Sequence, residues 1–254
     1  MEELVVVKIG GNIVDNPALL TRLLKDFTAL KCKKILVHGG GKVATKVAAD
    51  LGIPTQMVEG RRVTDAASIK VVTSVYAGLI NKMVVSQLQA LGNRAWGVSG
   101  VDGALIPAQK RPVKAIDYGY VGDVLPHEVA VDGFDLLLHA GYSVVVAPIT
   151  SSAAGELLNT NADTIAQCVA VALSKRYCVQ LVYVLEKKGV LRDVDNPESV
   201  IKKMDYQSYQ QLKAKSVIFE GMLPKIENAF DAIQQGVNSV TIGDGINGNG
   251  TIIE

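Results

Sequence analysis

The stretch Leu4-Val5-Val6-Val7-Lys8-Ile9-Gly10-Gly11 decides the fold of this 254-residue chain. Its unbroken β-branched run, interrupted only by one lysine, is typical of a strand buried on both faces of a sheet, and the glycines indicate a turn. Residues 34–38 repeat the pattern, end in Gly39-Gly40-Gly41, and are followed by apolar residues at helical spacing. A strand, a glycine turn and a helix occur twice, which predicts an α/β fold with a mostly parallel central sheet.

The rest of the chain continues this alternation. Apolar spacing predicts helices over about 17–30, 65–91, 134–139, 162–174, 206–212 and 226–235, and strands over about 94–98, 143–149, 178–185 and 239–242. A hairpin is expected over about 113–125, turning at Tyr118-Gly119. No linker or repeat interrupts the chain, so we expect one domain with a soft boundary near Ile149.

The composition excludes several classes of protein. Charged residues make up 20% of the chain and hydrophobic ones 48%, which is typical of a compact globular protein. The formal net charge of +1 provides no field that would attract nucleic acid, so no nucleic-acid partner is expected. No uninterrupted apolar run reaches the roughly 18 residues of a membrane helix, so no membrane partner is expected either.

The chain start and the cysteines indicate the compartment. Glu2 and Glu3 stand where a signal peptide needs positive charge, so we expect a cytoplasmic protein. The number of cysteines is odd, and their spacing does not match that of a metal site, so we expect all three to be buried reduced thiols: Cys32, Cys168 and Cys178.

Three glycine clusters follow predicted strands: Gly10-Gly11, Gly39 to Gly41, and Gly97 to Gly103. Such turns let backbone N–H groups approach an anion, although turns between strands and helices favour glycine in any case. Two clusters at one carboxyl edge of a parallel sheet favour phosphate binding. The second cluster is not a Walker motif because Val43 replaces Ser or Thr, and residues 243–248 are interpreted as a plain glycine loop.

Four polar residues stand out beside these turns. Lys8 interrupts an apolar strand, and Lys225 follows closely on Gly221 near a helix start, so each is explained by an anionic ligand. The alternative for Lys8 is a buried stem with a solvated end. Asp163 lies in the first turn of a helix, where it either serves chemistry or only caps the helix. Arg62 either binds a substrate carboxylate with two hydrogen bonds from its guanidinium or is an ordinary surface arginine.

These residues form an ordered set of motifs. In sequence order they are Val7-Lys8-Ile9-Gly10-Gly11, Val37-His38-Gly39-Gly40-Gly41, Gly60-Arg61-Arg62-Val63-Thr64, Gly119-Tyr120-Val121-Gly122, Asn159-Thr160-Asn161-Ala162-Asp163 and Gly221-Met222-Leu223-Pro224-Lys225. The set resembles the motifs of the amino acid kinase family, from Lys8 to about Gly250. Within the family it is most similar to the members that phosphorylate N-acetylglutamate in arginine biosynthesis.

The resemblance implies a three-layer αβα sandwich with an acyl-amino-acid lobe (about 1–149) and an ATP lobe (about 150–254). It implies that Lys8 and Lys225 neutralise the transferring phosphoryl group and that Asp163 orients both. Further roles by motif are backbone donation and phosphate binding by Gly10 and Gly11, and substrate binding by Gly40, Gly41, Arg62 and Asn159. ATP would be the phosphoryl donor, with Mg²⁺ bound to its phosphates and no separate metal site in the protein.

The chemistry is consistent with this assignment. A glutamate side-chain carboxylate has a pKa near 4.3, so it is a nucleophile at neutral pH and needs no general base. Phosphoryl transfer then depends mainly on positioning and on cations around the phosphoryl oxygens. His38, His127 and His139 are not clustered in sequence and are interpreted as structural or surface groups.

Several alternatives stay open. Leu185-Glu186-Lys187-Lys188-Gly189 departs from the Thr-Asp or Ser-Asp of relatives beside the nucleotide loop. The acyl group is acetyl or a related group such as succinyl, and another family member acting on a carboxylate, carbamate or phosphate is a further possibility. A third possibility is a nucleotide-binding regulatory protein that has lost its catalytic activity. Lys8 lies close to the chain start, whereas arginine-inhibited hexameric members carry an extra helix there, so we expect a homodimer insensitive to arginine.

Overall fold

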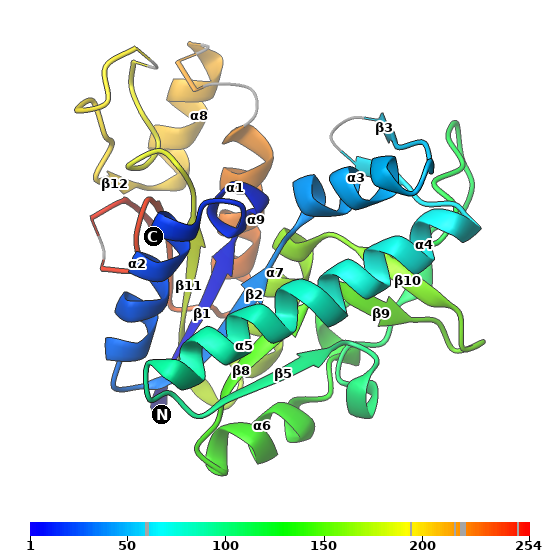
Figure 1. Ribbon diagram of the computed structural model, residues 1–254. Helices are drawn as coiled ribbons and strands as arrows, with labels where there is room; N and C mark the ends of the chain where they lie inside the picture. The colour runs from blue at the N-terminus through cyan, green and yellow to red at the C-terminus, as the bar shows by residue number, and fades with distance from the viewer. Residues whose placement is uncertain (59–60, 194, 216, 219–221, 248) are drawn as a thin grey trace.

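An eight-stranded sheet forms the centre of the computed structural model, which describes residues 1–58, 61–193, 195–215, 217–218, 222–247 and 249–254 (Figure 1). In order across the sheet the strands are β12 (Lys203–Met204), β14 (Thr251–Ile253), β13 (Ser239–Gly243), β11 (Tyr177–Val184), β1 (Glu2–Ile9), β2 (Lys33–His38), β8 (Ser143–Ala147) and β5 (Ala95–Ser99). The six strands from β13 to β5 are parallel, which confirms the mostly parallel sheet. Because they share one direction, their carboxyl ends meet at one edge.

Helices cover both faces of this sheet. One face carries α1 (Gly11–Val14), α2 (Pro17–Ala29), α3 (Gly41–Asp50), α4 (Ala66–Thr73) and α5 (Asn81–Ala90), and the other carries α6 (Val131–His139), α7 (Ala162–Leu173), α8 (Tyr206–Ala214) and α9 (Leu223–Gln234). Strand β1 lies between the two cores: Val5 and Val7 pack on the first face, and Leu4 and Val6 on the second. Each layer buries one apolar face of its helices, so the predicted αβα sandwich is confirmed.

Two small sheets extend the molecule beside this edge. One is the hairpin of β3 (Gln56–Val58) and β4 (Arg61–Val63), and the other has the order β6 (Gln109–Lys110), β7 (Val121–Asp123), β10 (Leu157–Thr160), β9 (Ile149–Ser151). The hairpin predicted over about 113–125 is wrong in its first strand, because β6 ends at Lys110 and residues 111–120 form a loop. Gly119, where the turn is expected, instead forms an isolated parallel bridge with Thr64; its φ is +71°, and the Thr64 carbonyl oxygen lies 2.3 Å from where a Cβ would be.

Two strand predictions need correction. The strand expected over 143–149 stops at Ala147 and resumes in the smaller sheet at Ile149, because Pro148 has no N–H for a ladder. Strand β14 was missed: it follows the glycine loop predicted over 243–248 and pairs antiparallel with β13. A three-residue strand is too short to show a pattern in the sequence.

The helix predicted over 65–91 is continuous from Ala66 to Ala90 but contains a π-helical segment, Ser74–Ile80. By length and composition alone it could cross a membrane, but half of its apolar window is buried in the protein, as in a core helix. All three cysteines are free thiols, as predicted, but only Cys168 is buried; Cys32 and Cys178 are partly exposed, so the predicted burial is wrong for these two. Burial raises the pKa of the Cys168 thiol to about 12.

Candidate active site

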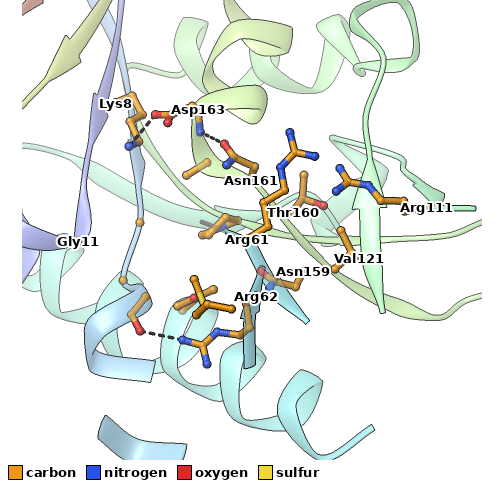
Figure 2. Close-up of a pocket in the computed structure, with 17 residues that line it drawn as sticks. Lys8, Gly11, Arg61, Arg62, Arg111, Val121, Asn159, Thr160, Asn161 and Asp163 are labelled. Carbon is orange, nitrogen blue, oxygen red and sulfur yellow. Dashed lines mark hydrogen bonds and ion pairs between the residues drawn. The ribbon is translucent and has the colours of Figure 1, made fainter. Parts of the chain in front are cut away.

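A carboxylate with a lysine on each side lies at the carboxyl edge of the sheet. Lys8, near the end of β1, places its Nζ 2.7 Å from Oδ1 of Asp163 in the first turn of α7 (Figure 2). Lys225, in the first turn of α9, places its Nζ 3.0 Å from the other carboxylate oxygen, Oδ2. The structure thus brings together the three residues that the sequence predicts to be catalytic, from three separate elements.

Local structure fixes the central carboxylate. The side chain of Asn161, not that of Asp163, caps α7 by accepting hydrogen bonds from the backbone N–H groups of Asp163 and Thr164. Burial by itself raises the pKa of Asp163, but the charges of Lys8 and Lys225 outweigh it and hold the pKa below its ordinary value. One carboxylate between two ammonium groups leaves an excess positive charge at this point.

Two cavities meet at Lys8. The first cavity, of about 220 Å³, is lined by Asp163, Gly40, Arg62 and Asn159, among others. The second, of about 780 Å³, is lined by Gly10, Lys225 and residues 184–187. Five residues line both cavities: Lys8, Gly11, Gly41, Met57 and Arg62. A reaction between a ligand in each cavity would therefore take place beside the lysines.

Glycine turns form the floor at this junction. Gly10 and Gly40 precede the first residues of α1 and α3, whose first-turn N–H groups have no partner within a helix. The two turns pack closely: a Cβ on Gly39 would lie 3.4 Å from the Gly11 nitrogen, and one on Gly40 would lie 2.2 Å from Cδ1 of Ile80. Backbone donors and two helix N-termini therefore converge where phosphate oxygens are expected.

Arg62 and Asn159 line the first cavity but also hold the protein together. The buried guanidinium of Arg62 donates to the hydroxyls of Thr55 (2.9 Å) and Thr45 (2.6 Å) and to the Gly41 carbonyl (3.0 Å). Asn159 donates from Nδ2 to the Thr64 hydroxyl at 3.0 Å. Arg62 is therefore not the ordinary surface arginine of the alternative interpretation, although a role in substrate binding stays a prediction.

Comparison with known proteins identifies the family. A profile described as the amino acid kinase family matches residues 3–244. The chain belongs to the amino acid kinase family. It is 51% identical to a protein named acetylglutamate kinase from Cytophaga hutchinsonii, over 95% of this chain and 91% of that protein. It is 52% identical to another of that name from Bacteroides fragilis, over 95% and 92% of the two chains.

Solved structures agree on the fold of this amino acid kinase. A crystal structure of a Streptococcus mutans protein has a TM-score of 0.81 at 28% identity and covers 98% of both chains. The N-acetylglutamate synthase of Neisseria gonorrhoeae, complexed with coenzyme A and N-acetyl-glutamate, has a TM-score of 0.81 at 23% identity, over 99% of this chain and 59% of that one. The second likeness shows the fold alone.

The third glycine cluster of this amino acid kinase has no part in either cavity. A Cβ on Gly97 would lie 2.1 Å from Oδ1 of Asn81, and one on Gly100 would lie 2.8 Å from the Ile106 carbonyl oxygen. These glycines allow close packing of β5 and its following loop. The phosphate-binding interpretation of Gly97 to Gly103 is therefore wrong.

Sequence reasoning missed three residues that line the first cavity: Arg61, Tyr76 and Arg111. Tyr76 lies in the π-helical segment, which the sequence pattern does not predict. Arg111 follows β6 and precedes the hairpin predicted over about 113–125, so no predicted element positions its side chain. Arg61 was part of a family motif and carried no assigned role. Gly60 and Gly221, which belong to predicted motifs, lie outside the described residues.

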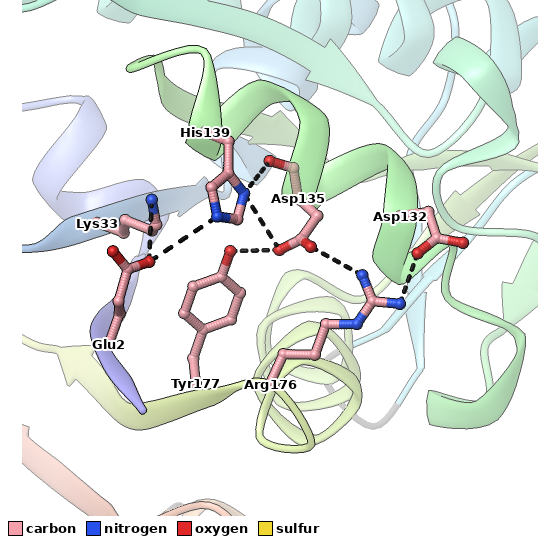
Figure 3. A network of polar contacts seen from close by, with 7 residues as sticks. All are labelled: Glu2, Lys33, Asp132, Asp135, His139, Arg176 and Tyr177. Carbon is pink, nitrogen blue, oxygen red and sulfur yellow. Dashed lines mark hydrogen bonds and ion pairs between the residues drawn. The ribbon is translucent and has the colours of Figure 1, made fainter.

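The histidines lie apart from the cavities. His38 is fully buried, and burial lowers its pKa to about 4. Its Nδ1 contacts the Gly39 carbonyl at 2.9 Å. His139 lies at the opposite edge of the sheet, in a polar network that joins α6 to the amino ends of β1 and β11 (Figure 3). These positions confirm the structural interpretation of His38 and the surface position of His139.

Proposed function

We propose that this chain is an ATP-dependent kinase that phosphorylates the side-chain carboxylate of an N-acylated glutamate, N-acetyl-L-glutamate included, to an acyl phosphate in arginine biosynthesis. The single observation that carries the proposal is the position of Lys8, Asp163 and Lys225 at the meeting point of two cavities. The names of the relatives supply the substrate. A nucleotide-binding protein without catalysis does not require two lysines, one buried and one partly buried, paired with the same carboxylate.

The two cavities suggest where each ligand binds. We assign the acyl-glutamate to the first cavity, with its α-carboxylate beside Arg62 and Asn159. We assign ATP to the second, which includes Lys225 and the altered segment beginning at Leu185. The division into an acyl-amino-acid lobe (about 1–149) and an ATP lobe (about 150–254) stays part of this proposal. Each cavity is lined from both sides of that boundary: residues between 8 and 62 line the second cavity, and Asn159 and Asp163 line the first.

The reaction requires little covalent chemistry from the protein. The ionised side-chain carboxylate of the substrate attacks the γ-phosphorus of ATP in line, a phosphorus–oxygen bond forms, and ADP leaves. Lys8 and Lys225 neutralise the charge on the transferring group, the glycine turns donate backbone hydrogen bonds, and Asp163 holds both lysines in position. No proton must be removed from the nucleophile, which explains a site without a histidine.

The side chains around the two cavities are consistent with Mg²⁺ that is bound to the phosphates of ATP. Among the described residues no group of three or more His, Cys, Asp or Glu could hold a metal ion. The carboxylate at the phosphate site, Asp163, is already engaged by two lysines. Mg²⁺ would be held by the ATP phosphates and would neutralise part of their charge.

We further propose that the protein is cytoplasmic and homodimeric. Two large apolar side chains are exposed on the face of the helix Ala66–Ala90 and the adjoining strand: Leu79 is 58% exposed and Trp96 46%. An interface between two copies would cover such side chains. Light scattering during size-exclusion chromatography, with and without arginine, tests the dimer and its indifference to arginine.

The activity is tested by trapping the acyl phosphate as a hydroxamate. The purified chain is incubated with ATP, Mg²⁺ and hydroxylamine together with N-acetylglutamate, free glutamate, aspartate or carbamate. We expect product with N-acetylglutamate and at most traces with the others. Product with none of them, or with carbamate in preference, would overturn the proposed function.

A further inference from the structure

A third cavity, which the proposed function does not use, shares lining residues with the first cavity. This third cavity, of about 440 Å³, is lined by Arg61, Arg111, Lys114, Tyr118 and Asp123, with Pro112, Ala115 and Ile116. Arg61 and Arg111 line the first cavity as well. The two arginines therefore lie where the first and third cavities adjoin.

Arg111 is held in place by Asp123, and one nitrogen of its guanidinium has no hydrogen-bond partner among the described residues. Asp123 accepts hydrogen bonds from Nε at 3.1 and 3.2 Å and from Nη2, and the ring of Tyr118 lies 5.3 Å from the guanidinium carbon. The third nitrogen, Nη1, is buried and has no hydrogen-bond partner in the part of the chain that the structure describes. A buried donor without an acceptor is unfavourable, and a fixed guanidinium edge matches a carboxylate.

Arg61 adds a second charge at the same place. Its guanidinium has no ion-pair partner among the described residues, and Figure 2 shows it extending toward Arg111 across the cavity from Arg62. The third cavity is lined by three cationic side chains and one carboxylate, that of Asp123. The α-carboxylate and the reacting carboxylate of glutamate are already matched by Arg62 and by the lysines. The excess positive charge has no counterpart in an acetyl group.

We infer that the acyl group for which this site is built carries a carboxylate of its own, as succinyl does, and that Arg111 binds this carboxylate with Arg61 beside it. The inference rests on the proposed function, because it concerns a substituent on the same glutamate. An acetyl methyl leaves Nη1 of Arg111 bare, whereas the far carboxylate of a four-carbon dicarboxylic acyl group gives it an acceptor. N-acetylglutamate is then a substrate that binds more weakly at the same site.

The first test needs no variant. The kcat and KM of the wild-type chain are measured with N-acetylglutamate, N-succinylglutamate and N-succinamoylglutamate, the uncharged amide of similar size. We expect kcat/KM for the succinyl substrate to exceed both others at least about tenfold, mainly through KM, since the added bond is made equally in the ground and transition states. Equal values for the three substrates, a preference for acetyl, or equal use of the amide would overturn the inference.

The second test assigns the residue. Arg111→Gln should lower the ratio of kcat/KM for the succinyl over the acetyl substrate about 10- to 100-fold, because a charge-assisted hydrogen bond is lost. Lys110→Gln is the matched control: it removes a neighbouring cation that lines neither cavity and pairs with Glu156. We expect it to leave the ratio unchanged, and circular dichroism checks that both variants fold. A ratio unaffected by Arg111→Gln, or lowered equally by Lys110→Gln, contradicts the role of Arg111.

Different results would overturn the proposed function and the inference about the acyl group. Absence of turnover with every N-acylglutamate would remove the proposed function and this inference together. Turnover of N-acetylglutamate without a gain from the added carboxylate would leave the proposed function intact and remove only the inference.

Discussion

Lys8 and Asp163 form an ion pair of 2.7 Å between the end of a central strand and the start of a helix on one face of the sheet. Asp163 also binds Lys225, so a single carboxylate sets the distance between two cations. Without it the two ammonium groups would repel each other. The arrangement keeps both lysines extended toward one point before any phosphate arrives, which is the preorganisation that phosphoryl transfer needs.

Removal of either lysine should abolish most of the activity while the fold persists. We expect Lys8→Ala and Lys225→Ala each to lower kcat about 10²- to 10³-fold, the usual effect of losing one group that stabilises transition-state charge. Hydroxamate formation at saturating substrate measures kcat, and circular dichroism measures folding. Lys203→Ala, which removes an exposed lysine paired with Glu254, should behave as wild type. Turnover near the wild-type value in either site variant would refute the assigned role.

Asp163→Asn should reduce both activity and stability. The neutral amide cannot balance Lys8 and Lys225, so we expect the free energy of unfolding to fall by about 2–4 kcal/mol and kcat by about 100-fold. Urea unfolding at pH 7 and the hydroxamate assay measure the two effects. Asp132→Asn breaks an exposed pair with Arg176 and should cost less than about 1 kcal/mol. Equal losses in the two variants would mean that Asp163 is an ordinary surface carboxylate.

The central architecture could be predicted because its signals are local. The buried runs of β1 and β2 and the glycines that end them indicate a parallel sheet, and Lys8 stands out as the lone charge in an apolar run. The cap of α7 at Asn161 likewise follows from residue type. The pairing of Asp163 with particular lysines depends on tertiary structure. It is expected from the resemblance to the family motifs and not from the periodicity of the sequence.

The rest depends on contacts between distant segments. Arg111 obtains its place from Asp123 on a neighbouring strand, and the loop between them has no periodic pattern. The short strand β10, which carries Asn159, lies in a polar stretch that resembles a loop in the sequence. Glycines that bind phosphate and glycines that only permit packing look alike, which is why Gly97 was assigned wrongly.

His38 should make folding stability depend on pH. Burial lowers its pKa from 6.5 to about 4, so between these values the unfolded chain binds a proton that the folded chain does not. Stability is therefore full above pH 6.5 and is lost as the pH falls toward 4, by about 2 kcal/mol between pH 8 and pH 5. Urea unfolding across this range measures the slope. In His38→Gln the slope between pH 8 and pH 5 should become nearly flat, whatever the absolute stability of the variant, and an unchanged slope would exclude His38 as its source.

Gly40→Ala tests whether the close approach of the second glycine turn matters for binding. The new Cβ would lie 2.2 Å from Cδ1 of the buried Ile80 and 3.2 Å from the ring of Tyr76, so the turn or the π-helical segment must shift. We expect a loss of stability of about 1–3 kcal/mol, as for overpacking, and an increase in the KM for the acyl-glutamate because Gly40 and Tyr76 both line its cavity. Thermal unfolding and steady-state kinetics measure the two effects. Gly245→Ala adds the same methyl where no atom lies within 4 Å, so it should change neither quantity. A Gly40→Ala enzyme with wild-type KM would show that the turn has room to move without disturbing the substrate.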